Sequence, residues 1–252
     1  METNKEYRLV PTFGDSYGTG WKVMSDSFLR LFLLVLVMAF IAAPFKIFNF
    51  HINLADLHGN PWHRFRDFEN VFRFGALGLM AIGFGLIAML YALLVAPVFQ
   101  FGANKMFLDA VRQTKPEFET LIQGFRENYL TIILANLLVA ALVVLGFFAL
   151  IIPGIIISVR LVFVPYIVMD KKIDPIEAVE MSWRITKGHG WTIFFMGFVS
   201  IFIVIFGLIL LIIGIFPAII WVWSSFASLY QSILKEKEKS AEQVIEPVAG
   251  QV

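Results

Sequence analysis

The side chain with the greatest chemical potential in this sequence is Arg160, because it lies within a segment that is otherwise mostly apolar. An ionisable residue inside a membrane-spanning helix costs roughly 2.5 to 3.5 kcal/mol on insertion scales, so it is expected to have a partner. A guanidinium can bind two phosphate oxygens side by side, which would suit a lipid phosphate or another anionic ligand. The structural alternative is that Arg160 pairs with a carboxylate such as Asp109, or extends its side chain to the outer membrane face.

Asp170 and several prolines are further candidates. Asp170 follows the apolar segment that contains Arg160, and the two could together form a polar ligand site. Pro97 and Pro165 each remove a helical hydrogen bond, and in transporters such breaks expose backbone groups to substrate. A plain kink is the structural alternative. Pro153 and Gly154 together predict a tight turn between two helices.

Other catalytic or metal-binding patterns are not evident in the sequence. The chain has no cysteine, which excludes disulfides and thiolate metal sites. The histidines with nearby aspartates lack the helical spacing of a metal site; they are His51, His58 and His63, with Asp56 and Asp67. No nucleophile elbow or glycine-rich phosphate loop can be recognised. We therefore expect no enzymatic activity, no cofactor and no bound metal.

The composition indicates that the elements holding these residues lie in a membrane. Hydrophobic residues make up 59% of the chain, charged residues only 15%, and the mean hydropathy is +0.79. A soluble domain has roughly 25% charged residues, so the apolar excess is expected to face lipid. The net charge of +1 gives no reason to propose a nucleic-acid partner.

Long segments without any Asp, Glu, Lys or Arg predict the membrane-spanning helices. Residues 188–234 are one such segment, and the Gly214 to Pro217 region divides it into two parts. Each part has about the 20 residues that a helix needs to cross the hydrocarbon core. Applied to the whole sequence, this predicts an all-α polytopic bundle of six spans, at residues 28–48, 75–103, 129–151, 154–170, 191–213 and 217–234.

The distribution of basic residues predicts the orientation. Most of the 20 Lys and Arg residues lie in four segments, at residues 1–30, 105–126, 171–187 and 235–239. By the positive-inside rule these segments, and both termini, are expected in the cytoplasm. The predicted organisation is a cytoplasmic N-terminal segment with an amphipathic helix, a membrane domain and a disordered tail, at residues 1–27, 28–234 and 235–252.

Amphipathic patterns precede the first, third and fifth predicted spans. The one before the fifth begins at Asp174-Pro175-Ile176-Glu177, with a candidate N-cap, Pro at N1 and Glu at N3. A charged stripe beside a broad apolar face is typical of a helix lying in the membrane surface. We expect Trp183, Arg184, Lys187 and Trp191 to lie at that interface. The recurrence favours a threefold repeat of an in-plane helix followed by a hairpin.

One region resembles a known family. The motifs are Ile152-Pro-Gly-Ile-Ile-Ile-Ser-Val-Arg160, Val164-Pro-Tyr-Ile-Val-Met-Asp170 and the segment from Ile176 to Trp191. They resemble an uncharacterised bacterial family of six-helix integral membrane proteins, related to the membrane domain of some glycerophosphoryl diester phosphodiesterases. The resemblance implies a bacterial inner-membrane protein, but it implies no reaction.

Three hypotheses about function follow from these patterns. The first is a non-enzymatic scaffold or accessory factor that interacts with membrane lipids, a protein partner or a second copy of the chain. The alternative is a transporter or lipid-handling protein for an anionic ligand, with Arg160 and Asp170 in its site. The third is a membrane subunit acting with a separately encoded phosphodiesterase.

Overall fold

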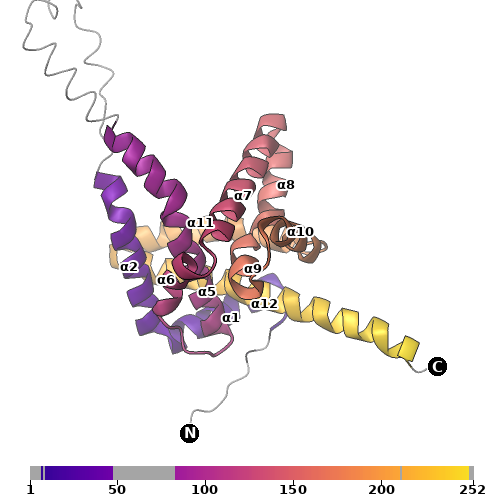
Figure 1. Ribbon diagram of the computed structural model, residues 1–252. Helices are drawn as coiled ribbons and strands as arrows, with labels where there is room; N and C mark the ends of the chain where they lie inside the picture. Colours follow the sequence, from indigo (N-terminus) through magenta and orange to yellow (C-terminus); the bar gives the residue numbers. More distant parts are fainter. Residues whose placement is uncertain (1–6, 8, 48–82, 211, 250–252) are drawn as a thin grey trace, which may run out of the picture. The chain divides into compact units, whose positions relative to one another are not determined.

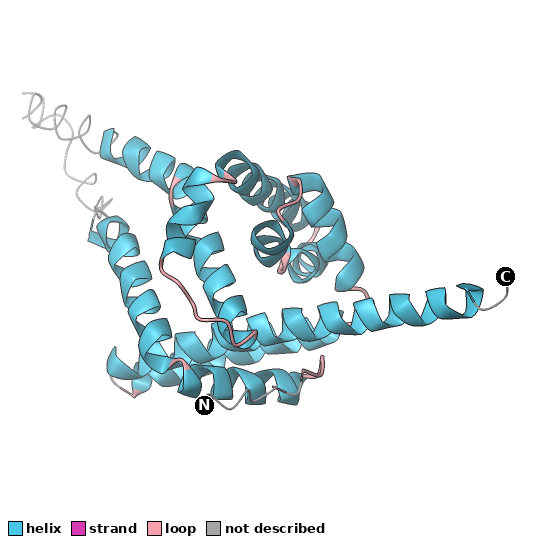
Figure 2. Cartoon of the chain, turned by 60° about the horizontal axis from the view of Figure 1, so that its bottom comes forward, coloured by secondary structure: helices cyan, strands magenta, loops and turns pink. Residues whose placement is uncertain are grey.

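The structure is a computed structural model that describes residues 7, 9–47, 83–210 and 212–249. All regular secondary structure in this part of the chain is α-helical, as Figure 2 shows. The chain divides into two compact units, one formed by Met1–Met38 with Pro97–Val252 and the other by Ala39–Ala96. The predicted outer connection, with the histidines at 51, 58 and 63, lies outside the described residues.

Figure 1 labels the helices in chain order. Their bounds are α1 Phe13–Asp26, α2 Phe28–Ile47, α5 Ala96–Val111, α6 Glu119–Arg126, α7 Tyr129–Ala149, α8 Ile151–Leu161, α9 Val164–Lys171, α10 Pro175–Ile185, α11 Gly190–Ile209 and α12 Ile212–Ala249. A further helix covers residues 83–94.

Several of these helices are long and apolar enough to cross a membrane. In the described residues four qualify, at Gly83–Val111, Tyr129–Ala149, Ile151–Lys171 and Gly190–Ile209. A fifth is obtained if α1 and the first part of α2, which are bent by 93°, are counted as one broken span. Much of the apolar surface of α7 and α11 is exposed, as lipid contact requires. The chain is therefore an all-helical, multi-pass membrane protein.

The predicted sixth span lies within α12, but α12 is not among the qualifying helices in the described part of the chain. The middle of α12 is buried inside the larger unit and carries small polar side chains, namely Ser224, Ser225, Ser228 and Ser232. Ser225 and Ser232 donate to the carbonyls of Trp221 and Ser228, at 2.7 and 2.8 Å, within their own helix. The middle of α12 thus packs within the larger unit, mainly against α1 and α11.

The N-terminal helix α1 packs directly on α12. Thr12 caps α1 by accepting a hydrogen bond from the amide of Asp15. Further along, the Trp221 indole donates to the Tyr17 carbonyl at 2.9 Å, and Gly20 approaches the backbone of Ser225. Helix α1 lies in the predicted N-terminal segment, residues 1–27, and it belongs to the same compact unit as α12. Small residues on both helices allow their backbones to approach closely.

Tyr17 also connects α1 to α11. Its hydroxyl donates to the Met196 carbonyl at 2.9 Å and lies 2.9 Å from the Ser200 hydroxyl. Met196 is fully buried, and both Tyr17 and Ser200 are less than a tenth exposed. Helices α1, α11 and α12 therefore form one packed group in which a buried polar side chain has its partners.

The hairpin of α7 and α8 turns at a single residue. Leu150 adopts an extended backbone between the two helices, and α8 begins at Ile151. Pro153 and Gly154, predicted as the turn, instead lie in the first turn of α8, where the missing amide of proline is tolerated. A Cβ on Gly154 would lie 2.6 Å from the Phe147 ring, so glycine allows α7 and α8 to pack closely.

Helices are present at all three positions where the sequence predicted an in-plane helix, namely α1, α6 and α10. Helix α10 begins at Pro175 after Asp174, although the Asp174 side chain makes no capping hydrogen bond. It ends at Ile185, before the positive φ of Gly188 at 98°. Its Trp183 side chain is 45% exposed.

Helix α12 continues beyond the packed region. Its residues are buried or partly buried from Gly214 to Leu234 and mostly exposed from Lys235 to Ser240. Where the sequence led us to expect a disordered tail, the structure has a helix that ends at Ala249. We expected disorder because this segment is polar, but its Lys, Glu, Ala and Gln residues are also strong helix formers.

The smaller unit contains the helix of residues 83–94 and part of α2. The Tyr91 hydroxyl donates to the Ile41 carbonyl at 3.5 Å, which connects these two helices. Val95 forms a turn after this helix, and Pro97 is the second residue of α5. A proline at this place removes the hydrogen bond to the residue four positions earlier, which accounts for the interruption.

Candidate functional site

Asp170 is the centre of a polar cluster at the end of α9. The apolar side chains of Ile167 and Val168 are fully buried, and they hold α9 so that the Asp170 side chain is only 5% exposed. Lys172, with a left-handed backbone at φ 52°, ends the helix directly afterwards. Pro165 lies in the first turn of the same helix. The sequence thus positions one carboxylate at a buried helix end.

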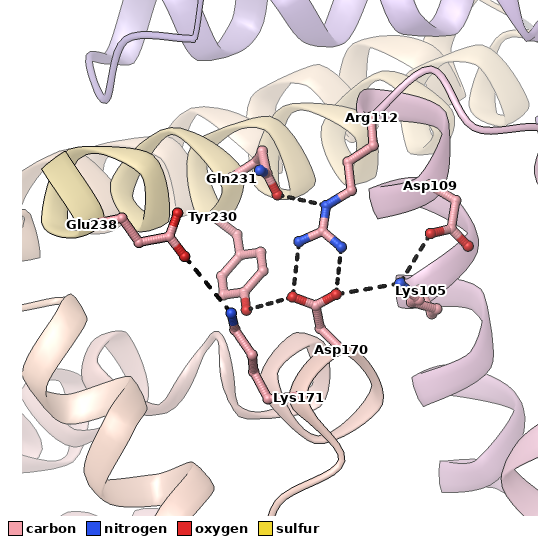
Figure 3. Close-up of polar contacts among 8 residues, drawn as sticks. All are labelled: Lys105, Asp109, Arg112, Asp170, Lys171, Tyr230, Gln231 and Glu238. Carbon is pink, nitrogen blue, oxygen red and sulfur yellow. Dashed lines mark hydrogen bonds and ion pairs between the residues drawn. The ribbon is translucent and has the colours of Figure 1, made fainter.

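Arg112 binds both oxygens of this carboxylate. Figure 3 shows the guanidinium facing Asp170, with Nη1 and Nη2 at 2.5 and 2.8 Å from the two oxygens. The remaining donor, Nε, is 2.8 Å from the side-chain oxygen of Gln231. Burial alone would lower the pKa of Arg112, but the hydrogen bonds to Asp170 and the attraction of the nearby negative charges together outweigh it and leave the pKa raised. The guanidinium is therefore a permanent cation with a bidentate acceptor.

Lys105 and Tyr230 complete the cluster. The Lys105 ammonium lies 3.0 Å from Asp109 and 3.3 Å from Asp170, so it connects the two carboxylates. The Tyr230 hydroxyl donates to Asp170 at 3.4 Å. The two cations and two carboxylates balance in charge and connect α5 to α9. Tyr230 and Gln231 connect them to α12 (Figure 3). We call these six residues the Asp170 cluster: Lys105, Asp109, Arg112, Asp170, Tyr230 and Gln231.

More exposed ion pairs extend from this cluster. Lys171 lies 3.7 Å from Glu238 of α12, and His189, which is a cation only when protonated, lies 3.5 Å from Glu236. Lys172 reaches Glu127, after α6, at 2.7 Å. Hydrogen bonds from Lys172 and Gln123 lower the pKa of Glu127. Each exposed pair contributes little to stability by itself, but together they connect α6, α9 and the start of α11 to α12 or to one another.

Arg160 occupies a different place, between α8 and α10. Its guanidinium carbon is 5.8 Å from the centre of the Trp183 ring, within the range of a cation–π interaction. Its backbone carbonyl accepts hydrogen bonds from Ser182 at 2.7 Å and from Thr186 at 3.5 Å. These contacts hold the end of α8 against α10.

The Arg160 side chain does not pair with Asp109, contrary to one of our expectations. Asp109 is one helical turn from Lys105 and pairs with it, whereas Arg160 faces α10. The Nη1 atom of Arg160 is buried and has no hydrogen-bond partner among the described residues. A buried cationic donor without an acceptor costs free energy, so the binding of an anionic group at this position would be favourable.

Two cavities meet at Arg160. The first, of about 560 Å³, has mainly apolar walls from α8 and α11, including Ile152, Ile156, Val159, Trp191 and Phe194. The second, of about 590 Å³, is lined by Val179, Glu180, Trp183 and Arg184 of α10 and by Lys187, which follows this helix. We call the two together the Arg160 groove. It combines a long apolar wall with three basic side chains and one acidic one.

Most of the candidate residues from the sequence fall into two groups in the structure. Asp109 and Asp170 meet in the Asp170 cluster, through Lys105. Arg160 meets Trp183, Arg184, Lys187 and Trp191 in the Arg160 groove. The remaining candidates, Pro97, Pro153, Gly154 and Pro165, lie in the first turns of helices α5, α8 and α9.

Sequence reasoning missed four members of the Asp170 cluster: Lys105, Arg112, Tyr230 and Gln231. For Lys105 a signal was present, since its spacing of four residues from Asp109 favours an ion pair on one helix. Arg112 and Gln231 are 119 residues apart, and nothing local to either indicates their contact.

Comparisons with protein-family models, curated proteins and solved structures find no match to this chain.

Proposed function

We propose that this protein is a non-enzymatic scaffold or accessory factor of the bacterial cytoplasmic membrane. In this proposal six helices span the bilayer, both termini lie inside, and the cytoplasmic face binds lipids or a partner protein. The proposed relation to the membrane domain of glycerophosphoryl diester phosphodiesterases rests on the three motifs between residues 152 and 191. It agrees with the apolar helices found in the structure.

The observation that carries this proposal is the Asp170 cluster. Both Asp170 oxygens accept from Arg112, Lys105 lies between the two carboxylates, and Gln231 accepts from the third guanidinium donor. Acid–base catalysis and proton relays need titratable groups whose charge can change. Here opposite charges hold each other in place and fasten three helices together, which favours a rigid structural role.

The ion pairs also support the proposed orientation. In the described ranges, each pair joins residues that lie in or directly after α5, α6 and α9, in the α10–α11 connection, or in α12 beyond Leu234. The sequence assigned these segments to a single side of the membrane. Direct contact between them requires that they share a side, and the excess of basic residues favours the cytoplasmic one.

This orientation predicts the outcome of thiol labelling. The chain contains no cysteine, so single substitutions introduce unique labels. We expect Lys172→Cys and Lys237→Cys to react with an impermeant maleimide only after the inner face is exposed in inverted vesicles. His58→Cys, in the predicted outer connection, is the matched control and should react in intact spheroplasts. Labelling of Lys172→Cys from outside would contradict the proposed topology.

A rigid scaffold and a transporter respond differently to immobilisation. Lys171→Cys together with Glu238→Cys would let a short bifunctional thiol reagent fasten α9 to α12, whose side chains already meet there. We expect a stoichiometric partner or lipid complement, identified by mass spectrometry, to be retained equally before and after cross-linking.

The transporter hypothesis predicts another result. If liposomes containing the protein accumulate an anionic solute, and if cross-linking or Arg160→Ala abolishes that flux at normal protein abundance, the scaffold proposal is wrong. The buried Nη1 of Arg160 is the observation that favours this second candidate.

A further inference from the structure

We propose that the Arg160 groove binds an anionic phospholipid. Its phosphate lies against Arg160, with Arg184 and Lys187 nearby, and an acyl chain follows the apolar wall formed by α8 and α11. This site specifies the lipid contact of the proposed function, and a lipid could bind there whether or not the protein recruits a partner.

The Arg160 side chain has a hydrogen-bond donor that is unsatisfied within the described residues. Nη1 of Arg160 is buried without a hydrogen-bond partner in the described part of the chain, while the guanidinium lies near the Trp183 ring. The carbonyl of Arg160 is also held, by Ser182 and Thr186 of α10. A fixed cation with an unused donor is suited to an oxyanion, and a guanidinium fits phosphate especially well.

The Arg160 groove carries an excess of positive charge. Arg160, Arg184 and Lys187 face Glu180 in the cavity beside α10, which leaves an excess of two positive charges. None of the three basic residues has an ion pair among the described residues. An anionic headgroup would supply the missing counter-charge, whereas a zwitterionic headgroup would supply it less well.

The groove also has an apolar wall, which the acyl chain of a lipid would contact and a free phosphate would not. The cavity beside α11 has isoleucine, valine, phenylalanine and tryptophan side chains around Arg160. Ile152 is 71% exposed and Trp191 is 74% exposed, so this wall continues onto open apolar surface. Because α8 and α11 belong to candidate spans, that surface faces acyl chains. Tryptophans beside a basic cluster are typical of the headgroup level.

The ligand is therefore expected to be amphiphilic, with its charged and apolar parts on opposite sides of Arg160. A peptide would leave its backbone polar groups unsatisfied against the apolar wall. A glycerophospholipid has no such groups along its acyl chain. The two cavities together thus favour an anionic phospholipid over a soluble anion or a peptide.

The test uses the tryptophans of the groove. The purified full-length protein would be placed in nanodiscs that contain phosphatidylglycerol or phosphatidylcholine with brominated acyl chains, since bromine quenches nearby tryptophan fluorescence. We expect phosphatidylglycerol to quench at a lower mole fraction than phosphatidylcholine. The variant with both Trp183→Phe and Trp191→Phe should lose this difference.

Charge variants identify the binding group. We expect Arg160→Gln to weaken the apparent affinity for phosphatidylglycerol about tenfold, since a charge-assisted hydrogen bond is lost, and Arg160→Lys to restore part of it. Arg126→Gln is the matched control, because Arg126 has a side chain that is 75% exposed and lies outside the groove. If Arg160→Gln fails to fold, Arg184→Gln with Lys187→Gln, both at exposed positions, replaces it.

The possible results separate the sources of the phosphate. Preferential quenching by phosphatidylglycerol that depends on Arg160 supports the proposal, and competition by inorganic phosphate should be weak. Equal quenching by both lipids would overturn it. Full displacement by millimolar phosphate would also overturn it, and would indicate a site for a free anion.

Discussion

Asp170→Asn should lower the free energy of unfolding by about 3 to 5 kcal/mol, the usual cost of breaking a buried ion pair by removing one partner. The Asp170 side chain is 5% exposed, and it accepts from Arg112 through both oxygens. Asparagine would leave the Arg112 and Lys105 cations facing each other with only Asp109 to balance them. Unfolding by sodium dodecyl sulfate in mixed micelles, followed by tryptophan fluorescence, measures the loss.

Two further variants test whether the loss of stability comes from the ion pairs of Asp170. Arg112→Gln added to Asp170→Asn removes the unbalanced cation, and the double variant should be more stable than Asp170→Asn alone. Lys171→Gln removes a neighbouring charge whose pair with Glu238 is exposed and 3.7 Å long, so its cost should be below about 1 kcal/mol. Similar losses for Asp170→Asn and Lys171→Gln would show that the Asp170 cluster does not hold the helices together.

Gly20→Ala should destabilise the protein by about 1 to 3 kcal/mol, the usual cost of forcing an extra group into a packed interior. A Cβ at Gly20 would lie 2.7 Å from the backbone nitrogen of Ser225 and 2.8 Å from its Cα. Backbone atoms of a buried helix cannot rotate away as a side chain can, so α1 would have to move from α12. The hydrogen bond from Trp221 to the Tyr17 carbonyl would then lengthen or break.

Gly18→Ala is the matched comparison for Gly20→Ala. Both positions are in α1, but a Cβ at Gly18 would meet nothing within 4 Å in the described structure. Here the higher helix propensity of alanine should stabilise the protein by up to about 1 kcal/mol. The two variants should therefore change the unfolding midpoint in opposite directions. Equal shifts would show that α1 and α12 are not in close contact.

Periodicity and hydropathy were sufficient to predict the helical class, the helices at α6 and α10, and most of the candidate spans. These features depend on local sequence: an apolar length suited to a bilayer, or an Asp-Pro start before an amphipathic stretch. The Asp174-Pro175 start of α10 is an example. The sixth predicted span lies within α12, which is not among the qualifying helices of the described residues. Many of its side chains are buried against other helices, and composition alone does not distinguish burial by protein from contact with lipid.

The candidate site was predictable in part. Arg160 and Asp170 stand out because each is ionisable and close to apolar sequence, and the structure gives both of them specific surroundings. Their partners could not be predicted in the same way. Asp170 meets Arg112 and Tyr230 across 58 and 60 residues, and these contacts exist only when α5, α9 and α12 pack together. Asp109, one of the possible partners considered for Arg160, pairs with Lys105 on its own helix.

The continuity of α12 has a mechanical consequence. The helix runs without a break from Tyr230 and Gln231, its two residues in the Asp170 cluster, to Ala249. At 1.5 Å per residue, the portion after Leu234 is a rod of about 22 Å. The start of this rod is held by the hydrogen bonds of Tyr230 and Gln231, so a force on its far end is transmitted to the Asp170 cluster. Any protein or lipid surface that tilts its far end applies torque directly to the hydrogen bonds of Arg112 and Asp170.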